Sequence, residues 1–155
     1  MTPPRPPKAP NPYLRTKVMT ASPEELRLML LQGAERFARA GRKELDQEKP
    51  DLEKSHEAWM KAQRIVVELS TSMNPAQSPE VVERLTALYT YIYKLLVDAN
   101  MTRELAPADE AIKLLAYERE TWELLMEQNR AEAAGGSAST GATRQAAMTA
   151  VRQAS

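Results

Sequence analysis

The chain has 155 residues, about the length of one ordinary domain. Its 21 basic and 21 acidic residues give a formal net charge of zero, which argues against a nucleic-acid-binding protein that relies on neutralising phosphates. It has no cysteine, so disulfides, thiolate catalysis and cysteine-bound zinc are excluded.

The charge is spread unevenly along the chain. Residues 1–20 carry basic side chains and no acidic one, whereas residues 21–128 hold 14 basic and 20 acidic side chains. The N-terminal residues lack the apolar core of a signal peptide, and no apolar run is long enough to span a bilayer. These patterns predict a cytoplasmic protein without a nucleic-acid partner and without membrane insertion.

The two ends of the chain have the composition of disordered segments. Six of the 11 prolines lie in residues 1–12, where each fixes a backbone angle and removes a hydrogen-bond donor. Residues 129–155 are small and polar, and the Gly135-Gly136 pair should break a helix that enters them. We therefore expect a disordered proline-rich arm at 1–12 and a disordered tail at 129–155.

The first long helix is predicted to start at Ser22. Ser22 can cap it, Pro23 suits its first turn, and Glu25 completes a capping box. Gly41 is a plausible stop. The apolar row that recurs at helical spacing is Leu26, Leu30, Gly33, Phe37 and Ala40.

Three more helices follow, one after Pro50, one opened by Ser78, and one that starts near Pro107 and ends at about Gln128. Their main apolar rows are Leu52, Ser55, Trp59, Ala62, Val66, Leu69 and Met73; then Val81, Leu85, Leu88, Ile92, Leu95 and Ala99; then Ala111, Leu115, Trp122 and Leu125. Because each row must be buried and the connections are short, residues 13–128 predict an all-α fold, an antiparallel four-helix bundle with a short N-terminal cap segment.

Several helices carry more apolar surface than one core-facing row needs. In the third helix, Tyr89 and Tyr93 share a face while Tyr91 points roughly the other way, so at least one tyrosine should be exposed. This excess has two interpretations, a wide core or an apolar groove that accepts an amphipathic helix of another chain. The residues that would form such a groove are Ile65, Leu69, Leu85, Tyr89, Tyr93 and Leu96.

The segment before the first long helix is too apolar for a plain linker. Tyr13, Leu14, Val18 and Met19 could lie over part of a groove until a partner displaces them, or contact the partner directly. The alternative is a hydrophobic staple that fixes how the chain enters the helix. We count Tyr13, Leu14 and Val18 among the predicted partner-binding residues.

Catalytic and metal-binding patterns are weak. His56 is the only histidine, and although Glu53 and His56 match one half of a di-iron bundle motif, the second histidine that such a site needs does not exist. The same histidine would be needed for any nucleophile–base pair. We expect no enzyme activity, no catalytic residue, no metal and no cofactor.

The order of the motifs resembles the flagellar secretion chaperone family FliS, over about residues 11–128. The resemblance rests on "NPY" ahead of "TASPEEL", "LML..GA.RF" in the first helix, "KAQRIVVEL" in the second, "L..LY.YIY.LL..AN" in the third and "LL…R.TW" in the fourth.

This resemblance implies a cytoplasmic export chaperone built as an antiparallel four-helix bundle. Family members bind the disordered C-terminal region of flagellin, prevent its premature polymerisation, and assist its delivery to the flagellar type III secretion apparatus. The partners would be flagellin and components of that apparatus. The chaperone itself would be a monomer or a weak homodimer. The alternative from another class of protein is a structural bundle that self-associates as a homodimer and has no flagellin client.

Overall fold

The computed structural model of the chain describes residues 11–74 and 76–135. It has five helices and, over these two ranges, no strand, which confirms the all-α prediction. The N-terminal segment forms a helix of its own, α1. The helices are α1 (Pro12–Thr20), α2 (Pro23–Leu45), α3 (Leu52–Thr71), α4 (Pro79–Thr102) and α5 (Leu105–Gly135).

Local sequence explains where the helices begin. At the start of α2, the Ser22 hydroxyl accepts from the Glu25 backbone N–H, and the Glu25 carboxylate accepts from the Ser22 backbone N–H, each at 3.2 Å. This is the predicted capping box, and it pairs two donors that a helix start leaves free. α3 and α4 each begin with a simpler cap of one hydrogen bond. The Asp51 side chain accepts from the Lys54 backbone N–H, and the Ser78 side chain accepts from the Val81 backbone N–H.

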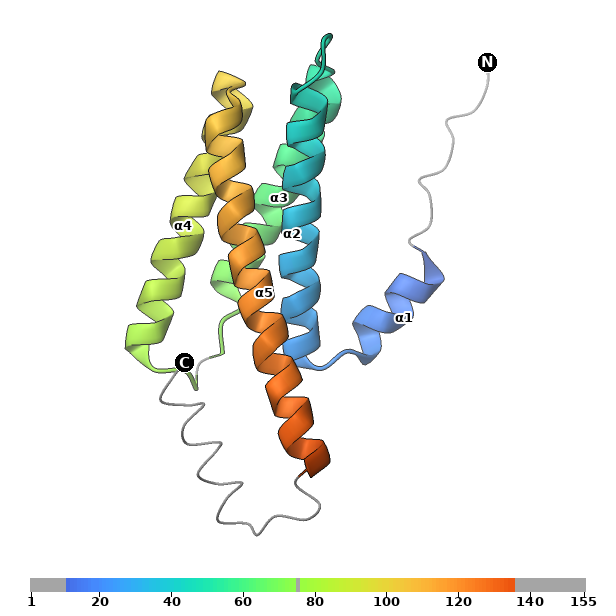
Figure 1. The fold of residues 1–155 in the computed structure, drawn as a ribbon, viewed down its shortest axis with the longest axis vertical. Coiled ribbons are helices and arrows are strands. Elements are labelled where there is room, and N and C mark those ends of the chain that lie inside the picture. Colours follow the sequence, from blue (N-terminus) through green and yellow to red (C-terminus); the bar gives the residue numbers. More distant parts are fainter. Residues whose placement is uncertain (1–10, 75, 136–155) are drawn as a thin grey trace.

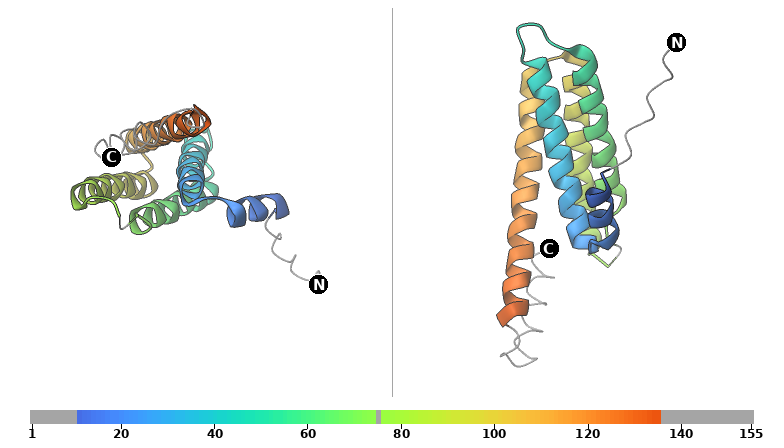
Figure 2. Two further views of the ribbon diagram at one scale, coloured as in Figure 1. Left: turned by 90° about the horizontal axis from the view of Figure 1, so that it is seen from below. Right: turned by 90° about the vertical axis from the view of Figure 1, so that its right-hand side faces the viewer.

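The four longer helices form the helical body, which we define as α2–α5. α2 packs against α3 and α5, and α4 packs against the same two helices. The end-on view shows them arranged around one centre, with α1 projecting from a corner of the body (Figures 1 and 2). Every residue of α1 is exposed. The core therefore belongs to α2–α5, and α1 lies outside it.

The core is built around two large aromatic side chains. Trp59 of α3 and Tyr89 of α4 are both almost completely buried, and the Trp59 indole N–H donates to the Ser55 hydroxyl at 3.0 Å. The predicted α3 row is buried along most of its length, except that Leu52 is exposed and Met73 half-buried. The other fully buried large side chains are Leu31, Val66, Leu69, Ile92, Leu96 and Leu115.

The inward face of α2 differs from the predicted one. Of the predicted row, Gly33 is buried, Leu26, Leu30 and Phe37 are half-buried, and Ala40 is exposed. Most buried positions form a neighbouring row that has leucine at both ends and small residues between them: Leu31, Ala34, Ala38, Gly41 and Leu45. Small side chains let α2 lie close to α3, so the larger apolar residues beside them are turned toward the edge of the core.

The sequence predicts that the helix stops at Gly41, and this prediction is wrong. α2 continues through Gly41 to Leu45. A Cβ atom at Gly41 would lie 2.7 Å from Cε2 of Trp59, closer than real Cβ contacts. The glycine therefore serves close helix packing, with no turn at this position. A left-handed residue does end α4, where Arg103 has a φ angle of 58°.

The ends of the described chain also refine the predicted boundaries. α5 begins at Leu105 and runs to Gly135, so residues 129–135 of the predicted tail are helical. At the other end, Pro12 is the first residue of α1, capped by the Asn11 side chain. The rest of the predicted arm (1–10) and of the predicted tail (136–155) lies outside the described residues.

Candidate partner-binding surface

The surface of the described residues carries an apolar groove of about 760 Å³, which we call the α1–α3 groove. α1 forms one wall, the outer face of α2 forms the floor, and the C-terminal turns of α3 form the other wall, with one side chain from α5. Its apolar lining residues are Leu14, Val18, Pro23, Leu26, Met29, Leu30, Gly33, Phe37, Ile65, Met73 and Trp122.

The sequence of α2 explains the groove floor. Successive residues on a helix are rotated by about 100°, so Leu30 and Leu31 cannot both face the core. Leu31 is buried with the row of small residues, while Leu30 and Phe37 pack against the edge of the core and stay half-buried. The row that looked like the core face of α2 is therefore largely the floor of the groove.

A polar cluster lies at the α5 side of the α1–α3 groove. The Arg27 guanidinium lies 5.5 Å from the ring centre of Tyr89 and 5.9 Å from that of Trp122. Its Nη2 donates to the Tyr89 hydroxyl at 2.8 Å, and its Nη1 donates to the Leu69 carbonyl at 3.5 Å. The Trp122 indole N–H donates to the Glu24 carbonyl at 2.9 Å. These contacts hold α5 against the first turns of α2.

The Tyr89 hydroxyl connects Arg27 to a carboxylate on α5. It donates to Glu118 at 3.4 Å. Burial raises the pKa of the Glu118 carboxyl, and the Arg27 charge and the Tyr89 hydrogen bond only partly oppose that rise. Burial likewise raises the pKa of the Tyr89 hydroxyl. The cluster therefore keeps Tyr89 neutral and makes ionised Glu118 costly.

A second, smaller hollow of about 210 Å³ lies between α3 and α4. Val67 and Tyr93 are exposed beside it, at 47% and 38% of their surface. Its hydroxyl-bearing neighbours come from both helices: Ser70, Thr71, Tyr89 and Thr90. It can accept one apolar side chain next to hydroxyl groups.

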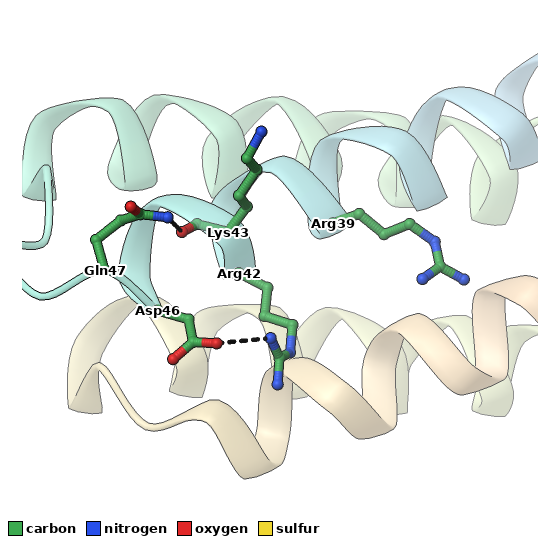
Figure 3. Close-up of a pocket in the computed structure, with 5 residues that line it drawn as sticks. All are labelled: Arg39, Arg42, Lys43, Asp46 and Gln47. Atoms are coloured by element: carbon green, nitrogen blue, oxygen red, sulfur yellow. Dashed lines mark hydrogen bonds and ion pairs between the residues drawn. The ribbon is translucent and has the colours of Figure 1, made fainter.

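A third hollow, of about 360 Å³, is polar and lies along the C-terminal half of α2 (Figure 3). Arg42 pairs with Asp46 at 3.2 Å and with Asp109 of α5. Arg39 pairs with the buried Glu35 at 2.9 Å. Because acidic partners already occupy these guanidinium groups, the hollow is better explained as a helix–helix contact than as an anion site.

The nine predicted partner-binding residues fall into three groups. Leu14, Val18 and Ile65 line the α1–α3 groove, and Tyr93 lines the α3–α4 hollow. Tyr13 is exposed on α1 and Leu85 is half-buried on α4. The remaining three, which the sequence left open between core and groove, lie in the core: Leu69, Tyr89 and Leu96. Contact with a partner stays a prediction for all nine.

Sequence analysis missed part of the groove. The helical spacing alone predicts Leu26, Leu30 and Phe37 as core residues and gives Arg27 no role. The available signal was the width of the apolar run in residues 26–31, where five of six side chains are apolar and Arg27 interrupts them. One helix face cannot bury so wide a run, so a second apolar face was to be expected.

His56 is exposed on α3, and its Nδ1 is 3.2 Å from the side-chain oxygen of Asn100. Within residues 11–74 and 76–135, no group of three histidine or acidic side chains is placed to hold a metal ion. None of the helices in that part of the chain is long and apolar enough to cross a bilayer.

Comparison with known proteins assigns the family. The family model described as "Flagellar protein FliS" matches residues 7–129. The flagellar secretion chaperone FliS of Bacillus subtilis (strain 168) is 30% identical over 123 residues, which cover 79% of this chain and 90% of that protein. The protein of the same name from Salmonella typhimurium (strain LT2) is 30% identical over 110 residues, covering 70% and 80%. The chain thus belongs to the FliS family of flagellar secretion chaperones.

Proposed function

We propose that α2–α5 form an antiparallel four-helix bundle that acts as a cytoplasmic export chaperone for flagellin. It binds the disordered C-terminal region of flagellin, prevents its premature polymerisation, and assists its delivery to the flagellar type III secretion apparatus. Binding and release carry this function, so it needs no catalytic residue and no cofactor.

The observation that carries this proposal is the α1–α3 groove on a chain of this family. The groove is lined mostly by apolar side chains, and one wall is a short helix whose residues are all exposed. Such a surface suits an amphipathic helix that places apolar side chains in the groove. Ordering a disordered client costs several kcal/mol, about 2–5, so a large contact area is needed.

The α3–α4 hollow supplies a second contact in this proposal. The client would place an apolar side chain beside Val67 and Tyr93 after crossing the end of the helical body. Three predicted residues are buried and would not touch the client, but they would fix the positions of the surface residues packed on them: Leu69, Tyr89 and Leu96. Leu85 would be covered only by a client that also reaches α4.

α1 has the position expected of a placeholder. Leu14 and Val18 are one helical turn apart and both line the α1–α3 groove, so one face of α1 covers part of the surface offered to a client. A tethered segment competes at an effective concentration that is of millimolar order for short links. We propose that the client displaces this face of α1.

The proposed function is tested by titrating the full chain with a peptide covering the C-terminal region of a flagellin from the same genome. Saturable binding with a gain of peptide helicity is expected. Light scattering of the chain with and without the peptide separates this function from the rival one. A stable dimer that ignores the peptide would favour a self-associating structural bundle, whose groove holds a second copy.

A further inference from the structure

Arg27 has an unusual place among the arginines of this protein. In the described part of the chain, three arginines are half-buried: Arg27, Arg42 and Arg119. Arg42 pairs with Asp46 and Asp109, and Arg119 pairs with Glu35 and Glu123. None of the ion pairs among the described residues includes Arg27.

The contacts that Arg27 does make are with neutral groups. Its guanidinium packs near the rings of Tyr89 and Trp122 and donates to the Tyr89 hydroxyl and the Leu69 carbonyl. A guanidinium has more N–H donors than these two hydrogen bonds use, and Arg27 lines the α1–α3 groove. The remaining donors therefore depend on water while the groove is open.

A partner that covers the α1–α3 groove removes the water on which these Arg27 donors depend. An occupant with only apolar side chains would remove that water and leave N–H donors of a charged group without acceptors, which weakens its binding. A carboxylate placed there would replace the water by charge-assisted hydrogen bonds in the fork geometry that arginine favours. Glu24 and Glu68 also line the groove, but both are exposed and neither pairs with Arg27. Glu118 is connected to Arg27 only through the Tyr89 hydroxyl and does not line the groove.

We propose that Arg27 is a specificity-determining residue of the α1–α3 groove, which selects a partner helix carrying an aspartate or glutamate among its apolar anchors. This proposal rests on the proposed function, since the partner is the flagellin segment. The acidic side chain docks on the Arg27 guanidinium beside Trp122 and completes the ion pair that Arg27 lacks in the free chaperone. The apolar floor supplies affinity, and Arg27 sets the register of the client in the groove.

The experiment compares the wild-type chain with Arg27→Met, which keeps an apolar stem and removes the cation, and Arg27→Lys, which keeps the charge without the fork. Each is titrated with the flagellin C-terminal peptide, with versions in which single acidic residues are changed to the corresponding amide, and with a version whose terminal carboxylate is amidated. Arg64→Met, at an exposed position on α3 that is not among the groove-lining residues, is the matched control. Urea unfolding of each variant reports whether the fold is kept.

The expected result is that Arg27→Met binds the peptide at least tenfold more weakly, Arg27→Lys lies between it and the wild type, and Arg64→Met changes little. One acidic position in the peptide should weaken binding to the wild type by a similar factor and have no further effect on Arg27→Met. Such coupling in a double-mutant cycle identifies the pair directly. If Arg27→Met unfolds, the peptide series against the wild type and Arg27→Lys still identifies the acidic position.

The direction in which Arg27→Met changes peptide affinity decides the proposal. If Arg27→Met binds the peptide equally well or more tightly, the groove takes a purely apolar segment, and the proposed function stands without this inference. If only amidation of the peptide's terminal carboxylate couples to Arg27, the acceptor is the chain end and the side-chain proposal is wrong. If the wild-type chain binds no flagellin peptide, both the proposed function and this inference are removed.

Discussion

A Cβ atom on Gly41 of α2 would lie 2.7 Å from Cε2 of Trp59 on α3. Trp59 is completely buried, so a side chain at position 41 would force its ring or one of the two helices to shift. The close packing of α2 on α3 therefore requires the absence of a side chain at this one position. The same close packing turns the larger apolar residues of α2 toward the α1–α3 groove.

Replacing Gly41 with alanine should destabilise the protein. Overpacking a core costs about 1–3 kcal/mol, and alanine regains at most about 1 kcal/mol of helix propensity. We expect a net loss of about 1–2 kcal/mol in the free energy of unfolding, measured by urea denaturation. Gly135→Ala is the control, because nothing lies within 4 Å of a Cβ there. An equal or higher stability of Gly41→Ala would show that Trp59 can shift.

Glu35 should make stability depend on acid pH. Burial opposes its ionisation, but hydrogen bonds and charges from Arg119 and Arg39 outweigh burial and hold its pKa below the ordinary value. A carboxyl with a lowered folded pKa stabilises above its unfolded pKa, near 4.3, and this stabilisation is lost as pH falls through the folded value. Glu35→Gln should lower stability at pH 7 by about 1–3 kcal/mol and flatten the acid limb.

The measurement for Glu35 is the urea midpoint of the wild type and Glu35→Gln at several pH values from 3 to 7. Glu80→Gln is the control, since Glu80 forms an exposed pair with Arg84 on the surface of α4. The control profile should follow the wild type. A Glu35→Gln profile that also follows it would mean that the α2–α5 ion pair contributes little to folding.

Glu118 should affect the free energy of unfolding in the direction opposite to Glu35. Burial raises the pKa of its carboxyl, so the folded protein disfavours the ionised form. The contribution of Glu118 to the free energy of unfolding therefore falls as pH rises from the unfolded pKa to the folded pKa. Glu118→Gln should therefore raise the free energy of unfolding at pH 7 and leave it nearly unchanged at pH 3. Urea denaturation at the two pH values is the check. Destabilisation at pH 7 would assign the charge of Glu118 a net favourable interaction with Arg27.

The groove face of α1 can be tested without removing the helix. Leu14→Ser with Val18→Ser should weaken the hold of α1 on the groove and tighten binding of the flagellin peptide several-fold, because the competing face is lost. Lys17→Ser, on the same helix and outside the groove lining, is the control. Peptide affinity measured by calorimetry decides the outcome. Weaker binding by the double variant would make these residues direct contacts of the client.

Two tyrosines of α4 should respond differently to truncation. Tyr93→Ala removes an exposed ring and should keep the fold while weakening peptide binding. Tyr89→Ala removes a buried ring with its hydrogen bonds to Arg27 and Glu118, and should cost about 3–5 kcal/mol of stability. Circular dichroism melts and peptide titration separate the two effects. Unchanged affinity of a folded Tyr93→Ala variant would remove Tyr93 from the contact surface.

The sequence by itself determined the four longer helices and where α2, α3 and α4 begin. Ser22 with Glu25 and Ser78 before Pro79 are start signals that act within one helical turn, so they need no tertiary context. The α3 row around Trp59 was equally clear, because that helix has a single dominant apolar row. The family resemblance also rested on sequence alone, and the comparisons confirm it.

The tertiary structure decided which apolar residues are core and which are surface. On α2, the rows that contain Leu30 and Leu31 are both apolar, and hydrophobicity cannot rank them. Packing against Trp59 selected the row with Gly41, since only small residues allow that approach, and the row with Leu30 became the floor of the α1–α3 groove. The position of Arg27 at the edge of that floor follows from the same choice, because its contacts join α2, α3, α4 and α5.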